Sequence, residues 1–380
     1  MDFDKLLKIM VEKGGSDLFI TVGVAPSIKI HGKIVPVTKQ ALSAEQCREI
    51  VYDVMTEKQR DEFAAHSECN FAITSRGIGR FRVSAFLQRN LCGMVLRRIE
   101  TNIPKIEDLG LPETINQLAM TKRGLIIFVG ATGTGKSTSL ASMIGHRNRN
   151  SKGHIISIED PIEYIHQHDN CIVTQREVGI DTESFEIALK NTLRQAPDVI
   201  MIGEIRSKET MDHAVTFAET GHLCLATLHA NNANQALDRI INFFPAEQQN
   251  QIWMDLSLNL KAVVAQQLIP TPDGKGRKAV IEVLLNTPLC ADLIRKKEVH
   301  KLKELMTKSR DIGMQTFDQA LYDLYAAGDV TYEDALAYAD SANDLRLLIK
   351  LGSDASSSSQ LTSTTDRLSM QDDSSLDYGQ

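Results

Sequence analysis

The sequence predicts an α/β protein in which a small α+β unit precedes a larger domain of alternating strands and helices. Three observations predict it. The chain has 380 residues, which is room for two domains. From about residue 122, apolar runs alternate with helix-like segments, as in a largely parallel sheet covered by helices. One apolar run leads directly into GATGTGKS at Gly130–Ser137.

Residues 1–100 contain short strands and helices with conventional end signals. Phe3, Leu6 and Met10 have helical spacing, and Gly14 follows that helix. Ser43 and Gln46 form a predicted capping box, from which we expect one helix to run to about Phe63. Predicted strands cover 18–22, 27–31, 33–37, 69–74, 80–87 and 93–99. Residues 101–121, with prolines at 104 and 112, are interpreted as a linker.

Residues 122–288 form the predicted core of the larger domain, because buried strands and helices alternate there. We expect strands at 125–129, 154–158, 171–175, 199–202 and 223–227, helices at 136–146, 184–194, 208–220 and 234–243, and a hairpin of 263–269 with 279–285. Helices follow over 289–350. Residues 351–380 are rich in Ser, Thr and Asp, and we expect this tail to be disordered.

The motif GATGTGKS fits G-x-x-x-x-G-K-[ST], with a strand before it and a helix after it. Its glycines allow a tight turn whose N–H groups bind phosphate, and Lys136 can reach the β- and γ-phosphates. The Ser137 hydroxyl can ligate Mg²⁺. The predicted nucleotide contacts are Gly130, Ala131, Thr132, Gly133, Thr134, Gly135, Lys136, Ser137 and Thr138. The motif predicts binding of a nucleoside triphosphate.

Two acids compete for the second metal-linked position, because Asp198 opens the strand at 199–202 and Glu204 follows its end. They lie about 20 Å apart at strand rise, so both cannot face the phosphates. Ligands bind at the carboxyl ends of parallel strands, which favours Glu204.

The strand at 154–158 leads into Glu159, Asp160, Pro161, Ile162 and Glu163. Hydrolysis requires a carboxylate that orients or deprotonates the attacking water. We assign Glu163 to that role, and Glu159 or Asp160 to Mg²⁺, to its bound water or to support of its ligands.

His229 follows the strand at 223–227 and could contact the γ-phosphate, although a lone histidine often has a structural role. His222 is a weaker candidate. Arg80, Arg82 and Arg97 lie on N-terminal strands and could neutralise transition-state charge or form surface ion pairs. Arg206 could position Glu204.

The composition constrains the class of protein. The net charge of −7 argues against nucleic acid as the main partner. The six cysteines contain no C-x-x-C pair and suit a reducing compartment. The sequence contains neither a secretory signal nor an apolar run of about 20 residues. We therefore expect a soluble, cytoplasmic protein.

In order and spacing, GATGTGKS, IEDPIEY, APDVIMIGEIR and TGHLCLATLH resemble the Walker A, Asp box, Walker B and His box of the PilT/PilU-type secretion ATPases. The resemblance covers residues 1–350. It implies a PAS-like N-terminal domain, a RecA-like ATPase core with a C-terminal helical subdomain, and a hexameric motor using ATP and Mg²⁺. It also implies that Arg80, Arg82 and Arg97 close on ATP, and it supports Glu163, Glu204 and His229.

Two features locate the chain within this family. The zinc-binding tetracysteine element of assembly and secretion ATPases is absent from the sequence, which favours the retraction branch. Ala291–Glu298 departs from the AIRNLIRE motif of PilT-type motors, and the run from Ser309 onward is similar to PilU-type accessory retraction ATPases.

The resemblance thus implies a role in pilus retraction and twitching motility. The implied partners are further copies of the chain, a PilT-type ATPase and an inner-membrane platform protein, with peripheral attachment to the inner membrane. The open alternatives are a pilus-assembly or type II secretion ATPase, an ATP-binding partner with little hydrolysis, and a RecA-like nucleic-acid translocase. No N-K-x-D motif supports a GTPase.

Overall fold

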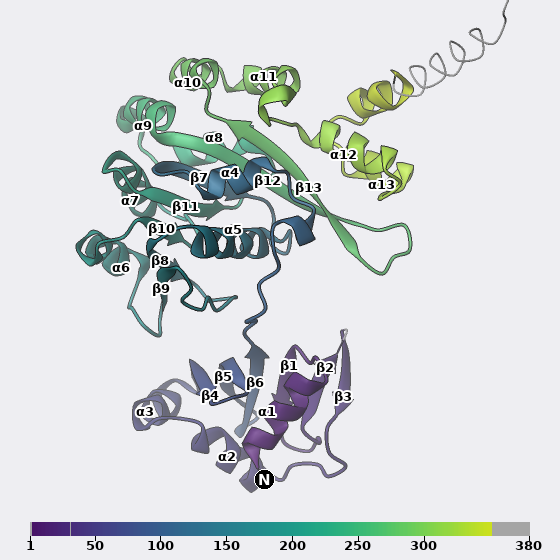
Figure 1. Ribbon diagram of the computed structural model, residues 1–380. Coiled ribbons are helices and arrows are strands. Elements are labelled where there is room, and N and C mark those ends of the chain that lie inside the picture. Colours follow the sequence, from purple (N-terminus) through teal and green to yellow (C-terminus); the bar gives the residue numbers. More distant parts are fainter. Residues whose placement is uncertain (1, 31, 352–380) are drawn as a thin grey trace, which may run out of the picture. The chain divides into compact units, whose positions relative to one another are not determined.

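The computed structural model describes residues 2–30 and 32–351 (Figure 1). The chain divides into two compact units. The first consists of the segments up to Ile106, Asn116–Leu125 and Ser137–Thr227, and the second of the rest of the described chain. The predicted disordered tail, 351–380, lies outside the described residues except for Leu351.

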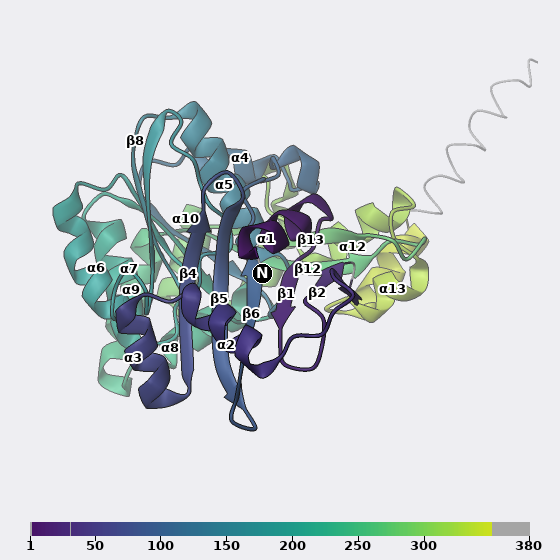
Figure 2. The same cartoon turned by 90° about the horizontal axis from the view of Figure 1, so that it is seen from below.

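The N-terminal part of the first unit is a six-stranded antiparallel sheet in the order β3-β2-β1-β6-β5-β4. Figure 2 shows β4, β5 and β6 running side by side. The strands are β1 (Asp17–Ile20), β2 (Ser27–Ile30), β3 (Lys33–Pro36), β4 (Glu68–Ser75), β5 (Gly79–Gln88) and β6 (Leu91–Arg98). All six were predicted, with shifts of one or two residues at their ends.

Three helices complete the hydrophobic core of this sheet. They are α1 (Phe3–Glu12), α2 (Ala44–Asp53) and α3 (Glu57–His66). The apolar stripe of α1, which includes Leu7 and Met10, is buried with Phe71 and Phe81 from the strands. Alternation along β5 buries one face and leaves the polar side chains of the other face free for function.

The predicted single helix from Ser43 to about Phe63 was wrong, because the structure has two helices there. The capping box of Ser43 and Gln46 is present and begins α2. A second start signal was overlooked. The Gln59 side chain accepts a hydrogen bond from the Thr56 N–H at 2.9 Å, which begins α3 after a break at Val54 and Met55.

The second sheet has seven strands in the order β13-β12-β7-β11-β10-β8-β9. The strands are β7 (Gly124–Val129), β8 (Gly153–Glu159), β9 (Cys171–Glu177), β10 (Val199–Ile202), β11 (Leu223–Leu228), β12 (Leu260–Pro270) and β13 (Arg277–Leu285). The pairs β8–β9, β8–β10 and β10–β11 are parallel, and the β12–β13 hairpin is antiparallel. The predicted mainly parallel core is thus a mixed sheet with one antiparallel hairpin.

The helices α5 (Lys136–Asn150), α6 (Phe185–Thr192), α7 (Lys208–Glu219) and α8 (Ala233–Ile241) follow strands of this sheet, as predicted. A further helix, α9 (Ala246–Asn259), was not predicted. It buries Ile252, Trp253 and Leu256 but is otherwise rich in Gln and Asn, so its apolar stripe is narrow. The predicted linker contains the short helix α4 (Thr114–Ala119).

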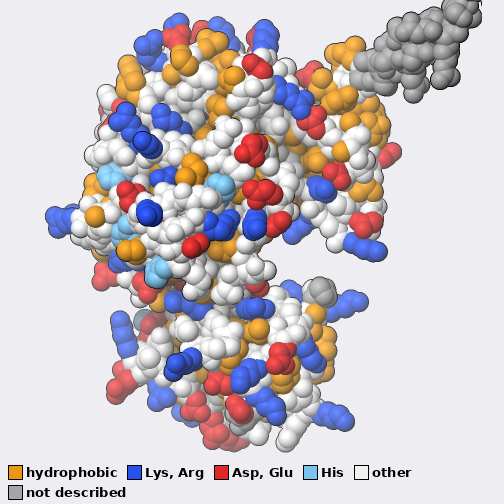
Figure 3. Space-filling view, in the orientation of Figure 1, with side chains coloured by type: hydrophobic (Ala, Val, Ile, Leu, Met, Phe, Trp, Pro, Cys, Tyr) orange, Lys and Arg blue, Asp and Glu red, His pale blue; other side chains and the backbone are white. Residues whose placement is uncertain are grey.

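The predicted helical segment at 289–350 contains the short helices α10 (Pro288–Arg295), α11 (Leu302–Lys308), α12 (Phe317–Ala326) and α13 (Tyr332–Ala337). A further helical stretch covers residues 342–351. Figure 3 shows acidic and basic side chains intermixed over the displayed face.

None of the helices in the described chain combines the length and apolar character needed to cross a bilayer.

The two capping boxes make a local prediction about stability. Replacing Ser43 with alanine should lower the free energy of unfolding by about 1 kcal/mol, because the Gln46 N–H loses its side-chain acceptor. Urea denaturation followed by circular dichroism measures this loss. The matched control is Ser84→Ala, at an exposed position on β5, which should change stability much less. Equal effects of the two substitutions would contradict the prediction.

Candidate active site

The phosphate-binding motif has the geometry that its sequence requires. Strand β7 is buried along its whole length and ends at the loop before α5. Gly135 has φ +89°, and a Cβ there would lie 2.8 Å from Nε2 of Gln266. A Cβ on Gly130 would lie 2.6 Å from the carbonyl oxygen of Gln266. Gly130 therefore requires glycine because a Cβ would meet the backbone of β12, and Gly135 because its φ lies in the left-handed region.

Lys136 is held against this loop. Its Nζ donates to the carbonyl oxygens of Gly130 and Ala131, each at 2.8 Å, and only 8% of the residue is exposed. The Thr134 hydroxyl donates to the same Ala131 oxygen at 2.9 Å. The positive charge of Lys136 thus lies at the same turn as the backbone N–H groups of the motif. This arrangement suits an anionic ligand.

Parallel register places the predicted acidic groups at one sheet edge. Ile202 of β10 is level with Ile158 of β8 and with Ala226 of β11. Asp160 and Glu204 therefore follow the ends of their strands on the same side of the sheet, where Thr227 lies near the end of β11. The Thr227 hydroxyl donates to the Gly203 carbonyl, and the Ile205 N–H donates to the Thr227 carbonyl at 2.8 Å.

Arg206 joins two of these acids. Its Nη2 lies 2.7 Å from Oε2 of Glu204, and its Nη1 lies 3.7 Å from Oδ2 of Asp160. These carboxylates raise the pKa of Arg206, with the Glu204 hydrogen bond as the largest cause. Asp198 lies at the opposite strand end, where its Oδ2 accepts from the His154 N–H at 2.8 Å. The structure thus separates the two competing acids as their spacing implied.

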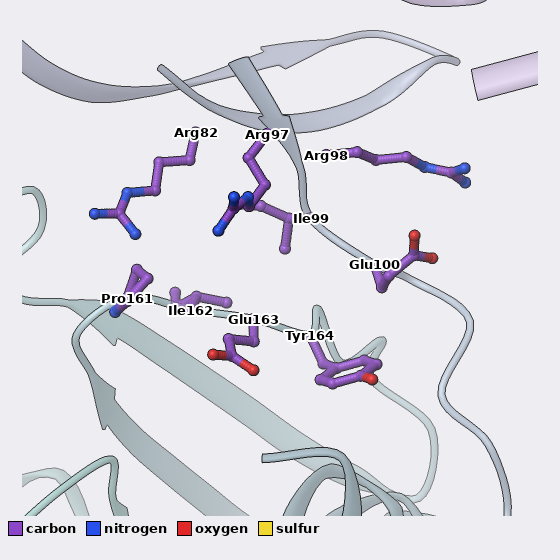
Figure 4. Close-up of a pocket in the computed structure, with 9 residues that line it drawn as sticks. All are labelled: Arg82, Arg97, Arg98, Ile99, Glu100, Pro161, Ile162, Glu163 and Tyr164. Carbon is purple, nitrogen blue, oxygen red and sulfur yellow. The ribbon is translucent and has the colours of Figure 1, made fainter. Parts of the chain in front are cut away.

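Glu163 lines a pocket of about 330 Å³ that also contains N-terminal arginines (Figure 4). The lining residues are Arg82, Arg97, Arg98, Ile99, Glu100, Pro161, Ile162, Glu163 and Tyr164. In Figure 4 the guanidinium groups of Arg82 and Arg97 extend toward the loop at Pro161, whereas Arg98 points away. The predicted base and two predicted arginines therefore meet in one pocket of the first unit.

The three arginines share one face of the N-terminal sheet. Arg82 is level with Arg97, and Arg80 is two residues from Arg82 on the same strand. The Nε of Arg80 is buried and makes no hydrogen bond within the described chain. The side chain of Arg97, 69% exposed, pairs with Asp17 at 2.9 Å. The alternative of a surface ion pair therefore fits Arg97 best. The charges of Arg80 and Arg82 are less fully paired with acidic groups.

Glu159 is 8% exposed and is held in the sheet rather than in this pocket. Its Oε1 accepts from the Ser157 hydroxyl at 2.6 Å and from Gln175 Nε2 at 3.0 Å. Burial raises the pKa of Glu159 to about 7. Among the described residues, no group of three or more His, Cys, Asp or Glu side chains could hold a metal ion. The assignments of Ser137, Glu159 and Asp160 to Mg²⁺ stay predictions.

His229 follows β11 and lines a pocket of about 550 Å³ in the second unit. Ala131 and Thr132 of the phosphate-binding loop line the same pocket, with Asn231 before α8 and Gln235, Asp238 and Arg239 on it. The Glu282 carboxylate fixes the start of α8 by accepting from the Ala233 N–H at 2.8 Å. His222 lies at the other end of β11, where its Nδ1 is 3.0 Å from the Thr220 hydroxyl and 3.3 Å from the Phe217 carbonyl oxygen.

Sequence reasoning missed three residues that surround the acidic loop. The Tyr164 hydroxyl lies 3.0 Å from Oγ1 of Thr138, in the first turn of α5. Gln175 and Glu177 of β9 contact the backbone of the same loop. The signal was present, since polar residues occupy alternate positions 157 and 159 of β8 and 175 and 177 of β9.

Comparison with known proteins decides the family. The model of the type II/IV secretion system protein family matches residues 3–336. The chain belongs to this family. Its relatives within the family include ATPases that resemble it over nearly their whole length.

The type IV pilus ATPase PilU of Pseudomonas aeruginosa is 76% identical over 371 residues, covering 98% of this chain and 97% of the relative. The type IV pilus retraction ATPase PilT of the same organism is 39% identical, over 88% and 97%. A crystal structure of the pilus retraction motor PilT with bound ADP superimposes with a TM-score of 0.85, at 39% identity over 91% of this chain and 99% of that one.

The buried carboxyl of Glu159 makes a prediction about pH. Because its pKa is raised in the folded state, its contribution to stability is present below about pH 4.5 and is lost as the pH rises through 7. Glu159→Gln removes this titration. The stability of this variant relative to wild type should therefore increase by roughly 2–3 kcal/mol between pH 5 and pH 8.

Urea denaturation at several pH values measures this difference. Glu247→Gln, at an exposed position of α9, is the matched control and should leave the pH dependence unchanged. A stability difference between Glu159→Gln and wild type that stays constant from pH 5 to pH 8 would refute the prediction.

Proposed function

We propose that this chain is an ATP-hydrolysing motor subunit that drives type IV pilus retraction and twitching motility, as the accessory partner of a PilT-type motor. One contact carries the proposal. The Tyr164 hydroxyl lies 3.0 Å from Thr138 Oγ1, which connects the phosphate-binding helix with the acidic loop. Glu163 adjoins Tyr164 in sequence, and Thr138 is two residues from Lys136, which supports the assignment of Glu163 as the base.

The residues fit ATP with Mg²⁺. Two glycines that exclude a Cβ, a buried lysine and a following helix suit a triphosphate. Mg²⁺ binds through few protein oxygens, with phosphates and water supplying the others, and Ser137 is the proposed direct ligand. When bound, ATP would supply the phosphoryl group, and Mg²⁺ would neutralise the negative charge that develops on it.

The chain's own residues then have distinct proposed roles. Lys136 binds the phosphates. Glu204, oriented by Arg206, and Asp160 bind Mg²⁺ or its water. Glu163 orients and deprotonates the attacking water. His229 contacts the γ-phosphate, and Arg80, Arg82 and Arg97 stabilise negative charge.

The finer architecture belongs to the same proposal. Residues 1–100 would form a PAS-like domain, 101–121 a linker, 122–288 a RecA-like core and 289–350 a helical subdomain. Six copies would assemble into a ring, alone or with a PilT-type ATPase, and dock on a platform protein at the cytoplasmic side of the inner membrane. Similarity to a type IV pilus ATPase and to a type IV pilus retraction ATPase, over nearly their whole length, supports a role in the same pilus machinery.

A steady-state ATPase assay on the purified chain, with and without a PilT-type partner, tests the proposal. Turnover that depends on Mg²⁺, and on Lys136, supports it. Nucleotide binding with no turnover under either condition would instead favour the alternative of an ATP-binding partner with little hydrolysis. In cells that lack the chain, its return tests the other alternative: restored pilus assembly, in place of restored retraction, would favour the assembly ATPase.

Two substitutions should separate binding from hydrolysis. Lys136→Ala should lose nucleotide affinity or turnover, because the ammonium meets the phosphates directly. Glu204→Ala should keep ATP binding and lose about 10²–10⁴-fold in turnover. A fluorescent ATP analogue measures binding, and phosphate release measures turnover.

Asp198→Asn is the matched control, because Asp198 lies at the opposite end of the same strand. It should reduce turnover much less than Glu204→Ala. A larger loss in Asp198→Asn would reverse the assignment of the acid.

Arg82→Ala should reduce turnover more than it reduces thermal stability, because Arg82 lines the Glu163 pocket. The same assays, together with a thermal melt, measure both effects. Arg89→Ala, at an exposed turn position of the same sheet, is the control. If Arg82→Ala lowers the melting temperature by several degrees while kcat stays unchanged, Arg82 is a structural residue only.

A further inference from the structure

Four polar side chains share one buried face of the sheet where apolar residues would be expected. Ser157 is level with Gln175, and Glu159 is level with Glu177, in the parallel pair β8–β9. Side chains two residues apart on a strand lie on the same face, so the four form one cluster. Three of them are buried and Gln175 is half-buried. Buried polar groups are costly unless they are bonded, so their partners show what the cluster holds.

The side-chain amide of Gln175 uses both of its N–H donors and its oxygen. Its Nε2 donates to Oε1 of Glu159 at 3.0 Å and to the Tyr164 carbonyl at 2.9 Å. Its Oε1 accepts from the His166 N–H at 2.8 Å. The reverse orientation of the amide would set an N–H group against the His166 N–H, so these partners select one orientation. Glu159 therefore orients the Gln175 amide, which bonds the backbone of the acidic loop at Tyr164 and at His166.

Two other contacts fix the loop around Glu163. Oε2 of Glu177 accepts from the Ile162 N–H at 3.4 Å. The Tyr164 hydroxyl contacts Thr138 at 3.0 Å. Both neighbours of Glu163 are thus bonded, while its own residue is exposed and lines the pocket with Arg82. The backbone is held and the carboxylate is left available.

We propose that Gln175 is a positioning residue for ATP hydrolysis, which holds the loop bearing Glu163 in place against the first turn of the phosphate-binding helix through Tyr164 and Thr138. The inference rests on the proposed function, because it assigns a means of positioning the same base. Gln175 contacts no nucleotide in this scheme. It acts through the backbone at Tyr164 and His166.

The expected effect follows from geometry. A displacement of about 1 Å at a reacting group can cost about 10²-fold in rate. Gln175→Leu keeps the volume but removes both donors and the acceptor, so kcat should fall about 10- to 100-fold. Affinity for ATP should change less than threefold, because Lys136 and the glycine loop are untouched.

The experiment uses the full chain under the conditions that give the highest turnover, including the PilT-type partner if it is required. The readouts are kcat, KM, affinity for a fluorescent ATP analogue and the thermal melt. Gln167→Leu is the matched control, since it makes the same change at an exposed residue of the following loop, and it should leave all four readouts unchanged.

Two further variants separate positioning from a general loss of structure. Tyr164→Phe removes only the hydroxyl and should lower kcat several-fold with little change in the melt. In a Glu163→Ala background, Gln175→Leu should lower kcat no further, because the group that it positions is gone.

Gln175→Glu adds a readout that a structural role would not move. Its carboxylate faces Glu159 and donates nothing at pH 8, but once protonated it donates again. Its kcat relative to wild type should therefore recover partly at pH 6, whereas the ratio for Gln175→Leu should not.

The outcomes are distinguishable. If Glu163→Ala loses turnover while Gln175→Leu and Tyr164→Phe both keep the wild-type kcat, the positioning role is wrong and the proposed function stands. If Gln175→Leu does not fold, Tyr164→Phe and Gln175→Glu decide in its place. If Glu163→Ala keeps wild-type turnover, the assigned base and this inference both fail.

Discussion

Parallel pairing of β8, β10 and β11 is the constraint on which the candidate site depends. Because Ile158, Ile202 and Ala226 are level in the sheet, three chain segments leave it at the same edge. The hydrogen bonds of Gly203 with Ile158 and of Ile205 with Thr227 extend that order beyond the strands. Acids more than forty residues apart in sequence consequently lie close together, since Arg206 contacts both Asp160 and Glu204.

A second constraint is the need to satisfy polar groups inside the sheet. Glu159 is buried, and it is bonded by Ser157 and Gln175. Such a carboxyl stabilises the fold less than an apolar residue of similar size would. Its partners explain its presence, because the same amide that bonds Glu159 also holds the loop bearing Glu163. Glu159 thus lowers the stability of the sheet locally, but through Gln175 it fixes the loop at the candidate site.

The N-terminal sheet contributes charge rather than a second nucleotide-binding motif. The alternation of β5 buries Phe81 and Val83 and leaves Arg80 and Arg82 on the other face. Both arginines lie close enough to Glu177 to oppose the rise in pKa that burial causes there. Under the proposed function, a change in this charge contact is a direct means of coupling hydrolysis to motion between rigid parts of the molecule.

The sequence by itself determined the elements whose signals are local. GATGTGKS after an apolar strand, the capping box at Ser43 and the alternation of strands and helices after residue 122 were sufficient for the phosphate-binding loop and for most strand positions. Local signals also misled where two of them lay close together. The capping signal at Thr56 split a helix that periodicity alone would continue, and the narrow apolar stripe of α9 concealed that helix.

Only the tertiary structure decided which side chains meet. Glu159, Asp160 and Glu163 are equivalent as sequence, since each is an acid after a strand. Strand alternation turns Glu159 into the sheet, the pairing of β8 with β10 brings Asp160 to Arg206, and the hydrogen bonds from β9 leave Glu163 in the arginine pocket. Register and long-range hydrogen bonds carry this information, and neither is a property of a short stretch of sequence.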